Sequence, residues 1–108
     1  MIYQYSVDCK PINWLFGDGY TIFYYMCGWG GNEIHVQANK PVRNECLDII
    51  NTIGGLWWTT IEPENKMAIN LCLRCGFEFF TQKTVIDGFD GKLVTMNIYK
   101  RHEDVQFR

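Results

Sequence analysis

Two residue pairs in the sequence carry side chains that could do chemistry, and the first is Cys72 and Cys75 in 63-PENKMAINLCLRCGF-77. A Cys-x-x-Cys spacing occurs in zinc sites and in redox-active dithiols. A structural zinc ion needs four ligands, and the other cysteines and both histidines are isolated along the chain. A redox pair opens a helix, whereas this pair falls at the end of one. We therefore predict two small buried thiols and no metal site.

The second pair is Glu33 and His35, two residues apart in 33-EIHVQAN-39, where apolar and polar side chains alternate. Successive residues of a strand point to opposite faces, so Glu33 and His35 share a face and could enter one cleft. A histidine titrates near neutral pH and can act as a general base or orient a substrate. The alternative is a hydrogen-bonded or half-exposed His35 with no role in catalysis.

The composition indicates one folded domain over residues 1–108. Hydrophobic residues make up 47% of the chain and aromatic residues 16%, which is enough for one modest core. The net charge of −2 provides no basic surplus for phosphate contacts, so we expect no nucleic-acid partner. No apolar run approaches the roughly 18–20 residues that span a bilayer, and no secretion signal is evident. With an odd number of cysteines, these features predict reduced thiols, a cytoplasmic location and no membrane association.

Apolar periodicity and turn residues predict a mixed α/β sheet, of the α+β type, with about six to seven strands and two main helices. Residues 8–19 are expected to be irregular or to carry one short helical turn, and residues 101–108 to form a flexible tail. The predicted strands are 2–7, 20–26, 33–39, 56–62, 77–85 and 92–100, and the predicted helices are 43–53 and 65–75.

Both predicted helices have sequence signals at their ends. Asn44 is the expected N-cap of the first helix, and Gly54 and Gly55 end it. Asn65 is the expected N-cap of the second helix, and Gly76 follows its last turn. The apolar stripes are Cys46, Leu47, Ile50 and Ile53 in the first helix and Ala68, Leu71, Cys72 and Cys75 in the second.

Two aromatic pairs, Trp57-Trp58 and Phe79-Phe80, lie in neighbouring predicted strands. We predict that these rings form a core around the strands, with one ring of each pair facing the opposite side. Exposed outward rings would instead mark a partner surface or a contact between copies of the chain. A binding protein would show a contiguous exposed patch, for which the candidates are Trp14, Trp29 and one of Trp57 or Trp58.

The segment 65-NKMAINLCLRCGFEFF-80 resembles the N-x-x-A-x-x-L-x-x-R-x-G-F segment of the Gcn5-related N-acetyltransferase (GNAT) superfamily. The upstream segment 33-EIHVQANKPVRN-44 is similar to the central strand and loop of small acetyltransferase-like proteins that bacteriophages often encode. The segment 56-LWWTTIEPEN-65 and the closing hairpin with 90-DGKLVTMNIYK-100 are similar to the next strands of that fold. The resemblance covers residues 20–100 in order and spacing.

The resemblance implies that acetyl-CoA binds where strands 33–39 and 56–61 splay apart, and that its acetyl group passes to an amine. The pantetheine arm would pair with an open strand edge, and the pyrophosphate would lie on the following loop and helix N-terminus. The implied contacts are the backbone of Val36, Gln37 and Ala38, then Lys40, Arg43 and Asn44 at the pyrophosphate, and Asn65 beside the cleft.

The resemblance also implies catalytic roles. Glu33 or His35 would deprotonate the amine, directly or through water. Cys72 occupies the position where the family commonly has a tyrosine that acts as a general acid. The segment 40-KPVRNE-45 contains no glycine, where the family has a glycine-rich phosphate loop, and residues 1–19 are a reduced form of the family's N-terminal region.

Two functions from different classes stay open on these residues. Glu33, His35 and Asn65 favour an acetyl-CoA-dependent N-acyltransferase whose partner is an amine substrate. The missing glycines and tyrosine favour a non-catalytic protein of the same fold, such as a virion component or a binder or inhibitor of a host protein. A phage-encoded protein of either kind would act in the host cytoplasm or in the virion.

Overall fold

The computed structural model describes residues 12–28, 30–86 and 90–102. They form six strands and two helices, in agreement with the predicted mixed sheet. The predicted strand 2–7, Trp29 and the chain beyond residue 102 lie outside the described residues. In chain order the elements are β1 (Asn13–Gly17), β2 (Tyr20–Met26), β3 (Asn32–Ala38), α1 (Arg43–Ile53), β4 (Trp57–Ile61), α2 (Lys66–Arg74), β5 (Glu78–Ile86) and β6 (Leu93–Arg101).

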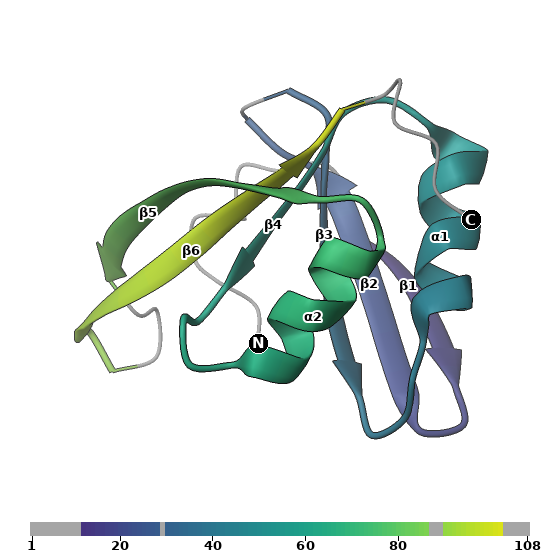
Figure 1. The fold of residues 1–108 in the computed structure, drawn as a ribbon, viewed down its shortest axis with the longest axis horizontal. Coiled ribbons are helices and arrows are strands. Elements are labelled where there is room, and N and C mark those ends of the chain that lie inside the picture. Colours follow the sequence, from purple (N-terminus) through teal and green to yellow (C-terminus); the bar gives the residue numbers. More distant parts are fainter. Residues whose placement is uncertain (1–11, 29, 87–89, 103–108) are drawn as a thin grey trace.

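All six strands belong to one sheet, in the order β1-β2-β3-β4-β6-β5. Its central neighbours β3 and β4 are parallel, and the other neighbouring strands are antiparallel (Figure 1). The sheet therefore consists of two antiparallel halves, β1-β2-β3 and β4-β6-β5, which meet at one parallel pair. Helix α1 connects the two parallel strands, as such a pair requires.

Residues 13–17 form a strand, so the prediction of an irregular or helical segment was wrong there. The pairing of β1 with β2 continues up to Gly17 and Tyr20, which leaves Asp18 and Gly19 as a two-residue turn. Gly19 has a φ of +81°, which glycine adopts without steric cost. An Asp-Gly pair between apolar runs is a strong hairpin signal, and this one was overlooked.

Both helices cover the same face of the sheet (Figure 1). Their buried side chains form one cluster with the side chains of β2, β3, β4 and β6 that point to that face. Each helix thus buries one apolar stripe, as a helical period of hydrophobic residues predicts. The cluster consists of Ile22, Ile34, Val42, Cys46, Leu47, Ile50, Trp57, Ile61, Cys72, Cys75, Phe77 and Tyr99.

Helix α1 has the predicted bounds but not the predicted N-cap. The N-cap is Val42, which makes no side-chain cap hydrogen bond, so the assignment of Asn44 was wrong. Pro41 disfavours a helical conformation at Lys40, and the helix begins two residues after the proline. The stripe prediction was also wrong for Ile53, which is 45% exposed because, as the last helical residue, it lies past the packed part of the stripe.

Helix α2 has the predicted ends. The Asn65 side chain accepts a hydrogen bond from the Ala68 N–H at 3.2 Å, which confirms Asn65 as the N-cap. Gly76 has a φ of +92°, typical of the residue that ends a helix. Cys72 and Cys75 are 6% and 2% exposed, which confirms that both are buried small side chains.

The aromatic pairs differ in burial. Trp57 and Trp58 are buried, as predicted for a core, and they therefore cannot extend an exposed patch from Trp14. Phe79 and Phe80 are each 56% exposed, so the core prediction was wrong for them. Both lie in edge strand β5 at a register shift against β6, where the strand has a neighbour on one side only.

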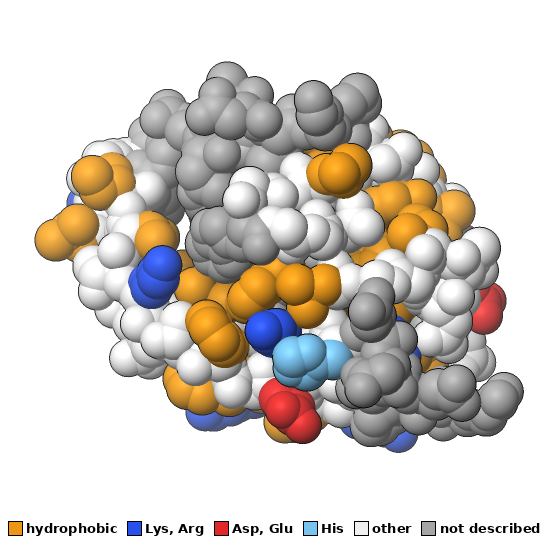
Figure 2. Space-filling view, turned by 90° about the horizontal axis from the view of Figure 1, so that it is seen from above, with side chains coloured by type: hydrophobic (Ala, Val, Ile, Leu, Met, Phe, Trp, Pro, Cys, Tyr) orange, Lys and Arg blue, Asp and Glu red, His pale blue; other side chains and the backbone are white. Residues whose placement is uncertain are grey.

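Figure 2 shows hydrophobic side chains gathered in several patches of the described surface, with single charged side chains between them. None of the helices in the described ranges has the length and hydropathy of a transmembrane segment. Within the same ranges, no three His, Cys, Asp or Glu side chains are grouped so that they could share a metal ion.

The end of β6 extends into the predicted tail: Arg101 is 2% exposed and donates a hydrogen bond to Asn51 Oδ1 at 3.0 Å.

We predict that Asn65→Ala lowers the free energy of unfolding by about 1 kcal/mol, because the first turn of α2 loses its side-chain cap. Urea or thermal denaturation measures the change. Asn70→Ala is the matched control, since Asn70 is an exposed residue of the same helix and its loss should change stability by less than about 0.5 kcal/mol. Equal losses in the two variants would contradict the role of the cap.

Candidate functional site

The parallel ladder between β3 and β4 is short. In the described residues it consists of two residue pairs, and the second pair joins Glu33 and Trp58. Beyond that pair the Thr59 hydroxyl donates a hydrogen bond to the Ile34 carbonyl oxygen at 2.8 Å. A side chain thus takes the place of the next ladder bond, and the remaining parts of the two strands diverge.

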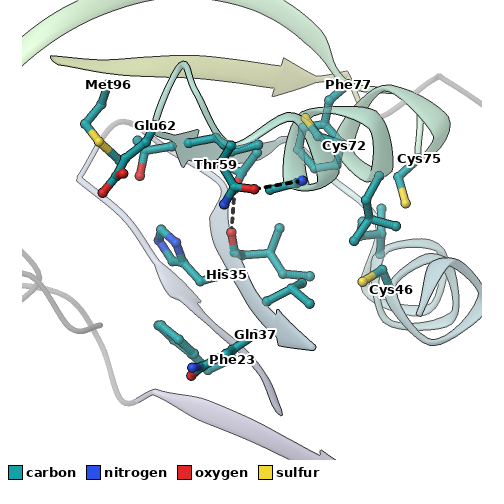
Figure 3. A pocket seen from close by; sticks show the side chains of 18 residues that line it. Phe23, His35, Gln37, Cys46, Thr59, Glu62, Cys72, Cys75, Phe77 and Met96 are labelled. Carbon is teal, nitrogen blue, oxygen red and sulfur yellow. Dashed lines mark hydrogen bonds between the residues drawn. The ribbon is translucent and has the colours of Figure 1, made fainter. Parts of the chain in front are cut away.

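A cavity of about 290 Å³ occupies the opening between the diverging strands (Figure 3). Its lining includes side chains from both faces of the sheet, so the cavity passes between the strands. Figure 3 shows the two sides: Cys46, Cys72, Cys75 and Phe77 on the helix side, and Phe23, His35 and Gln37 on the other. Thr60, Glu62 and Met96 also line the cavity.

The backbone N–H and C=O groups of successive β3 residues point in turn to β4 and to β2. The Asn32 N–H donates to the Leu56 carbonyl oxygen at 2.9 Å, on the side of β4. Every second residue of a strand directs its backbone groups to the same side, so those of Val36 and Ala38 point to the side of β4. Val36 lines the cavity and Ala38 does not. The backbone of Gln37 points to β2, and Gln37 lines the cavity with its side chain. For Gln37 the geometry therefore favours a side-chain contact over the backbone contact that the resemblance implies.

Glu33 and His35 contact each other on one face of β3. Nε2 of His35 lies 2.6 Å from Oε2 of Glu33 and 3.3 Å from the hydroxyl oxygen of Tyr25. The side chains of His35 and Glu33 are 12% and 3% exposed, and His35 lines the cavity. A carboxylate only accepts hydrogen bonds, so the neutral tautomer that can donate to Glu33 is the one with its hydrogen on Nε2. In a neutral imidazole, Nδ1 is then the nitrogen that can take up a proton.

Aromatic rings lead from His35 to the surface. Phe23 is the register partner of His35, and the two ring centroids are 5.1 Å apart. The ring of Trp14 lies 4.8 Å from that of Phe23 and stacks with Phe16 at 5.7 Å. Trp14 and Phe16 are 44% and 68% exposed, so this row of rings joins the cavity wall to the outer surface.

The residues that the resemblance implies at the pyrophosphate do not line the cavity. Lys40 is exposed, with Nζ 5.3 Å from the centre of a tyrosine ring of β2. Nε of Arg43 donates to the carbonyl oxygen of Arg74 at 3.2 Å and so joins the start of α1 to the end of α2. Asn44 is exposed in the first turn of α1. Asn65, in contrast, lines the cavity while it caps α2.

Three thiols line the helix side of the cavity. Burial raises the pKa of Cys72 above its ordinary value, and the neighbouring Cys75 adds to the shift. A thiol that resists ionisation is a weak proton donor, so Cys72 is poorly suited to replace the family's tyrosine. A hydrogen bond from Cys46 lowers the pKa of Cys75, and the same bond, with burial, raises that of Cys46.

Sequence reasoning missed Tyr25, Thr59 and Thr60 as members of this site. Tyr25 faces Glu33 in the register of β2 and β3, which follows from the hairpin around the glycine-rich turn and could have been inferred. The two threonines matter because the strands diverge there, and no local motif marks that event. Thr60 Oγ1 is buried and has no hydrogen-bond partner in the described ranges. Such a group requires a physical reason, and a molecule held in the cavity would supply one.

We predict that the free energy of unfolding decreases as the pH rises above about 9. Between about pH 8 and pH 10 the decrease should be smaller by about 1 kcal/mol in Cys72→Ala than in the parent chain. Folding raises the pKa of the Cys72 thiol. The thiol therefore makes its full contribution to the free energy of unfolding below the pKa that it has in the unfolded chain, and this contribution is lost as the pH rises above that pKa. Urea denaturation at each pH measures it. Thr84→Ala, at an exposed position of β5, removes no ionisable group and should retain the parent pH dependence. The same slope in Cys72→Ala and the parent would rule out this contribution.

No family model matches the chain, and no curated protein matches its sequence. Solved structures match its fold. A predicted phosphinothricin N-acetyltransferase superposes with a TM-score of 0.62 at 20% identity, over 81% of this chain and 62% of its own. YncA of Salmonella typhimurium, a predicted acetyltransferase whose structure contains its cofactor acetyl-CoA, superposes with a TM-score of 0.57 at 15% identity, over 79% of this chain and 59% of its own.

The chain thus spans about three fifths of the length of each of these two structures. At this level of identity the likeness concerns the fold. It confirms the predicted mixed sheet with two helices and extends over about four fifths of the chain. The chain has the fold of the Gcn5-related N-acetyltransferases, which its sequence resembles.

Proposed function

We propose that the chain binds acetyl-CoA in the opening between β3 and β4 and transfers the acetyl group to an amine. The divergence of the two parallel strands around the cavity carries this proposal, because Val36 lines the cavity and its backbone groups point to the side that β4 has left. The amide groups of a pantetheine arm can pair with such an edge as an added strand does. The GNAT fold supports the same proposal.

The N-terminus of α1 suits the pyrophosphate. The first N–H groups of a helix have no partner within the helix, and Val42 supplies no side-chain cap. These groups and the helix dipole favour an anion. Lys40 and Arg43 add positive charge, whereas Glu45 in the first turn opposes it. Without a glycine that lets the backbone approach closely, this loop is proposed to hold the pyrophosphate more weakly than a glycine-rich one does.

The side chains of β2 and β3 are proposed to prepare the amine. Acetyl-CoA, when bound, supplies an acetyl group activated as a thioester. An ammonium group has no free electron pair and must lose a proton before it attacks, and Nδ1 of His35 is the proposed base. Glu33 keeps the hydrogen on Nε2 and stabilises the imidazolium that forms. The Tyr25 hydroxyl contacts the same nitrogen and restricts the orientation of the ring.

Thermal denaturation with acetyl-CoA tests the binding step. A ligand at about 100 times its Kd stabilises a protein by about 2.7 kcal/mol, so we expect Tm to rise by roughly 10 °C. Ala68→Phe should abolish the rise, because Ala68 lines the cavity and a phenyl group would fill it. Leu73→Phe, at an exposed position of the same helix, should preserve it. No rise in the parent chain at millimolar acetyl-CoA would disprove binding.

We predict that His35→Ala lowers kcat by about 10²–10⁴-fold while acetyl-CoA still raises Tm, because the variant loses the base and keeps the opening between the strands. Release of the CoA thiol measures the rate. Glu33→Gln preserves a hydrogen-bonding side chain but removes the charge, so its loss should be smaller. An unchanged kcat in His35→Ala would mean that another group takes the proton.

The alternative is a non-catalytic binding protein of the same fold. Trp14 and Phe16 favour it, since large exposed hydrophobic side chains next to each other often mark a contact surface. The acetyl-CoA titration separates the two functions, because a protein that only binds a partner through this surface gains no stability from acetyl-CoA.

A further inference from the structure

We propose that the acceptor is an arylalkylamine, a primary amine carried by an aromatic group without an acid group beside it. This inference rests on the proposed acetyl transfer and names the substrate class for the side of the cavity that faces away from the helices. That side presents Phe23, His35, Gln37, Thr60, Glu62 and Met96.

The charges around the cavity favour a cation. In the part of the chain that the structure describes, no Lys or Arg side chain lines it. Glu62 belongs to the lining, and the carboxylate of Glu33 lies against His35. An acceptor's ammonium group is attracted by these carboxylates, whereas an acceptor's own carboxylate loses hydration without gaining a counter-ion. The site therefore favours a simple amine over an amino acid.

A buried hydroxyl on the same side is available to the amine. Thr60 lines the cavity, and its buried Oγ1 has no hydrogen-bond partner in the described ranges. A hydroxyl oxygen can accept a hydrogen bond from an amine N–H. Thr60 shares a sheet face with His35, so one amine can meet the hydroxyl and the base from the same side.

Aromatic rings favour an aromatic substituent. Phe23 and His35 lie together on this side of the cavity in Figure 3, with ring centroids 5.1 Å apart. The ring of Trp14, whose centroid lies 4.8 Å from that of Phe23, continues the same surface outward. Pairs of aromatic rings attract by more than the apolar area that they bury. A flat ring next to the amine would extend this row.

Three small amines test the acceptor class by calorimetry, with and without CoA present. The probes are 2-phenylethylamine, L-phenylalanine, which adds a carboxylate, and propylamine, which lacks the ring. We expect 2-phenylethylamine to bind at least tenfold more tightly than either of the others. Equal binding of L-phenylalanine would overturn the exclusion of acids, and equal binding of propylamine would overturn the preference for a ring.

Two conservative variants connect the preference to the named residues. Thr60→Val removes the hydroxyl at nearly constant volume and should weaken 2-phenylethylamine binding about tenfold. Thr84→Val, at an exposed position of β5, should not. Gln37→Arg adds a cation to the lining and should raise the affinity for L-phenylalanine, whereas Gln82→Arg on the exposed face of β5 should not. Unchanged affinities in Thr60→Val and Gln37→Arg would overturn the placement of the amine on this side.

The outcomes for the two proposals are separable. Acetyl-CoA stabilisation without the expected order of amines would overturn the acceptor class and leave acetyl transfer standing. The expected order of amines without acetyl-CoA stabilisation would overturn transfer and leave an arylalkylamine-binding site. Enzymatic assay of the three amines then has to reproduce the order found by calorimetry.

Discussion

The early end of the parallel ladder between β3 and β4 is the constraint on which the rest of the structure depends. A parallel pair buried at the centre of a sheet ordinarily continues its hydrogen bonds along its length. Here the ladder has two pairs in the described residues, and the Thr59 hydroxyl provides the next bond to β3. The backbone beyond it faces a cavity instead of a strand. Buried N–H and C=O groups are costly without partners, so the opening is suited to an extended ligand that carries amides.

The two helices are joined to each other and to the strands around the opening. Both pack on one face, where a single cluster joins them to β2, β3, β4 and β6. Arg43 joins the start of α1 to the last carbonyl of α2, and Asn65 caps α2 while it lines the cavity. The chain from β4 into α2 thus passes the cavity at Asn65, and the start of α1 is joined to the far end of α2.

The face away from the helices carries the polar chemistry. Glu33, His35 and Tyr25 form one hydrogen-bonded group there, and Phe23 lies against the imidazole. On the helix side, by contrast, three thiols lie among apolar side chains, and burial raises the pKa of Cys72. The proposed acetyl transfer assigns the apolar side of the cavity to the bound pantetheine chain and the polar side to the amine and its proposed base.

By itself, the sequence determined the features that depend on contacts within a few residues. The ends of α2 follow from its capping residues, the bounds of α1 from its apolar period and the glycines that end it, and the shared face of Glu33 and His35 from a period of 2. The hairpin at Asp18 and Gly19 was equally local, and its signal was present. Only the tertiary structure decided where the β3–β4 ladder stops and that the Thr60 hydroxyl is left without a partner in the described ranges. Those features depend on how strands and helices far apart in the chain pack against each other, which no local pattern of residues records.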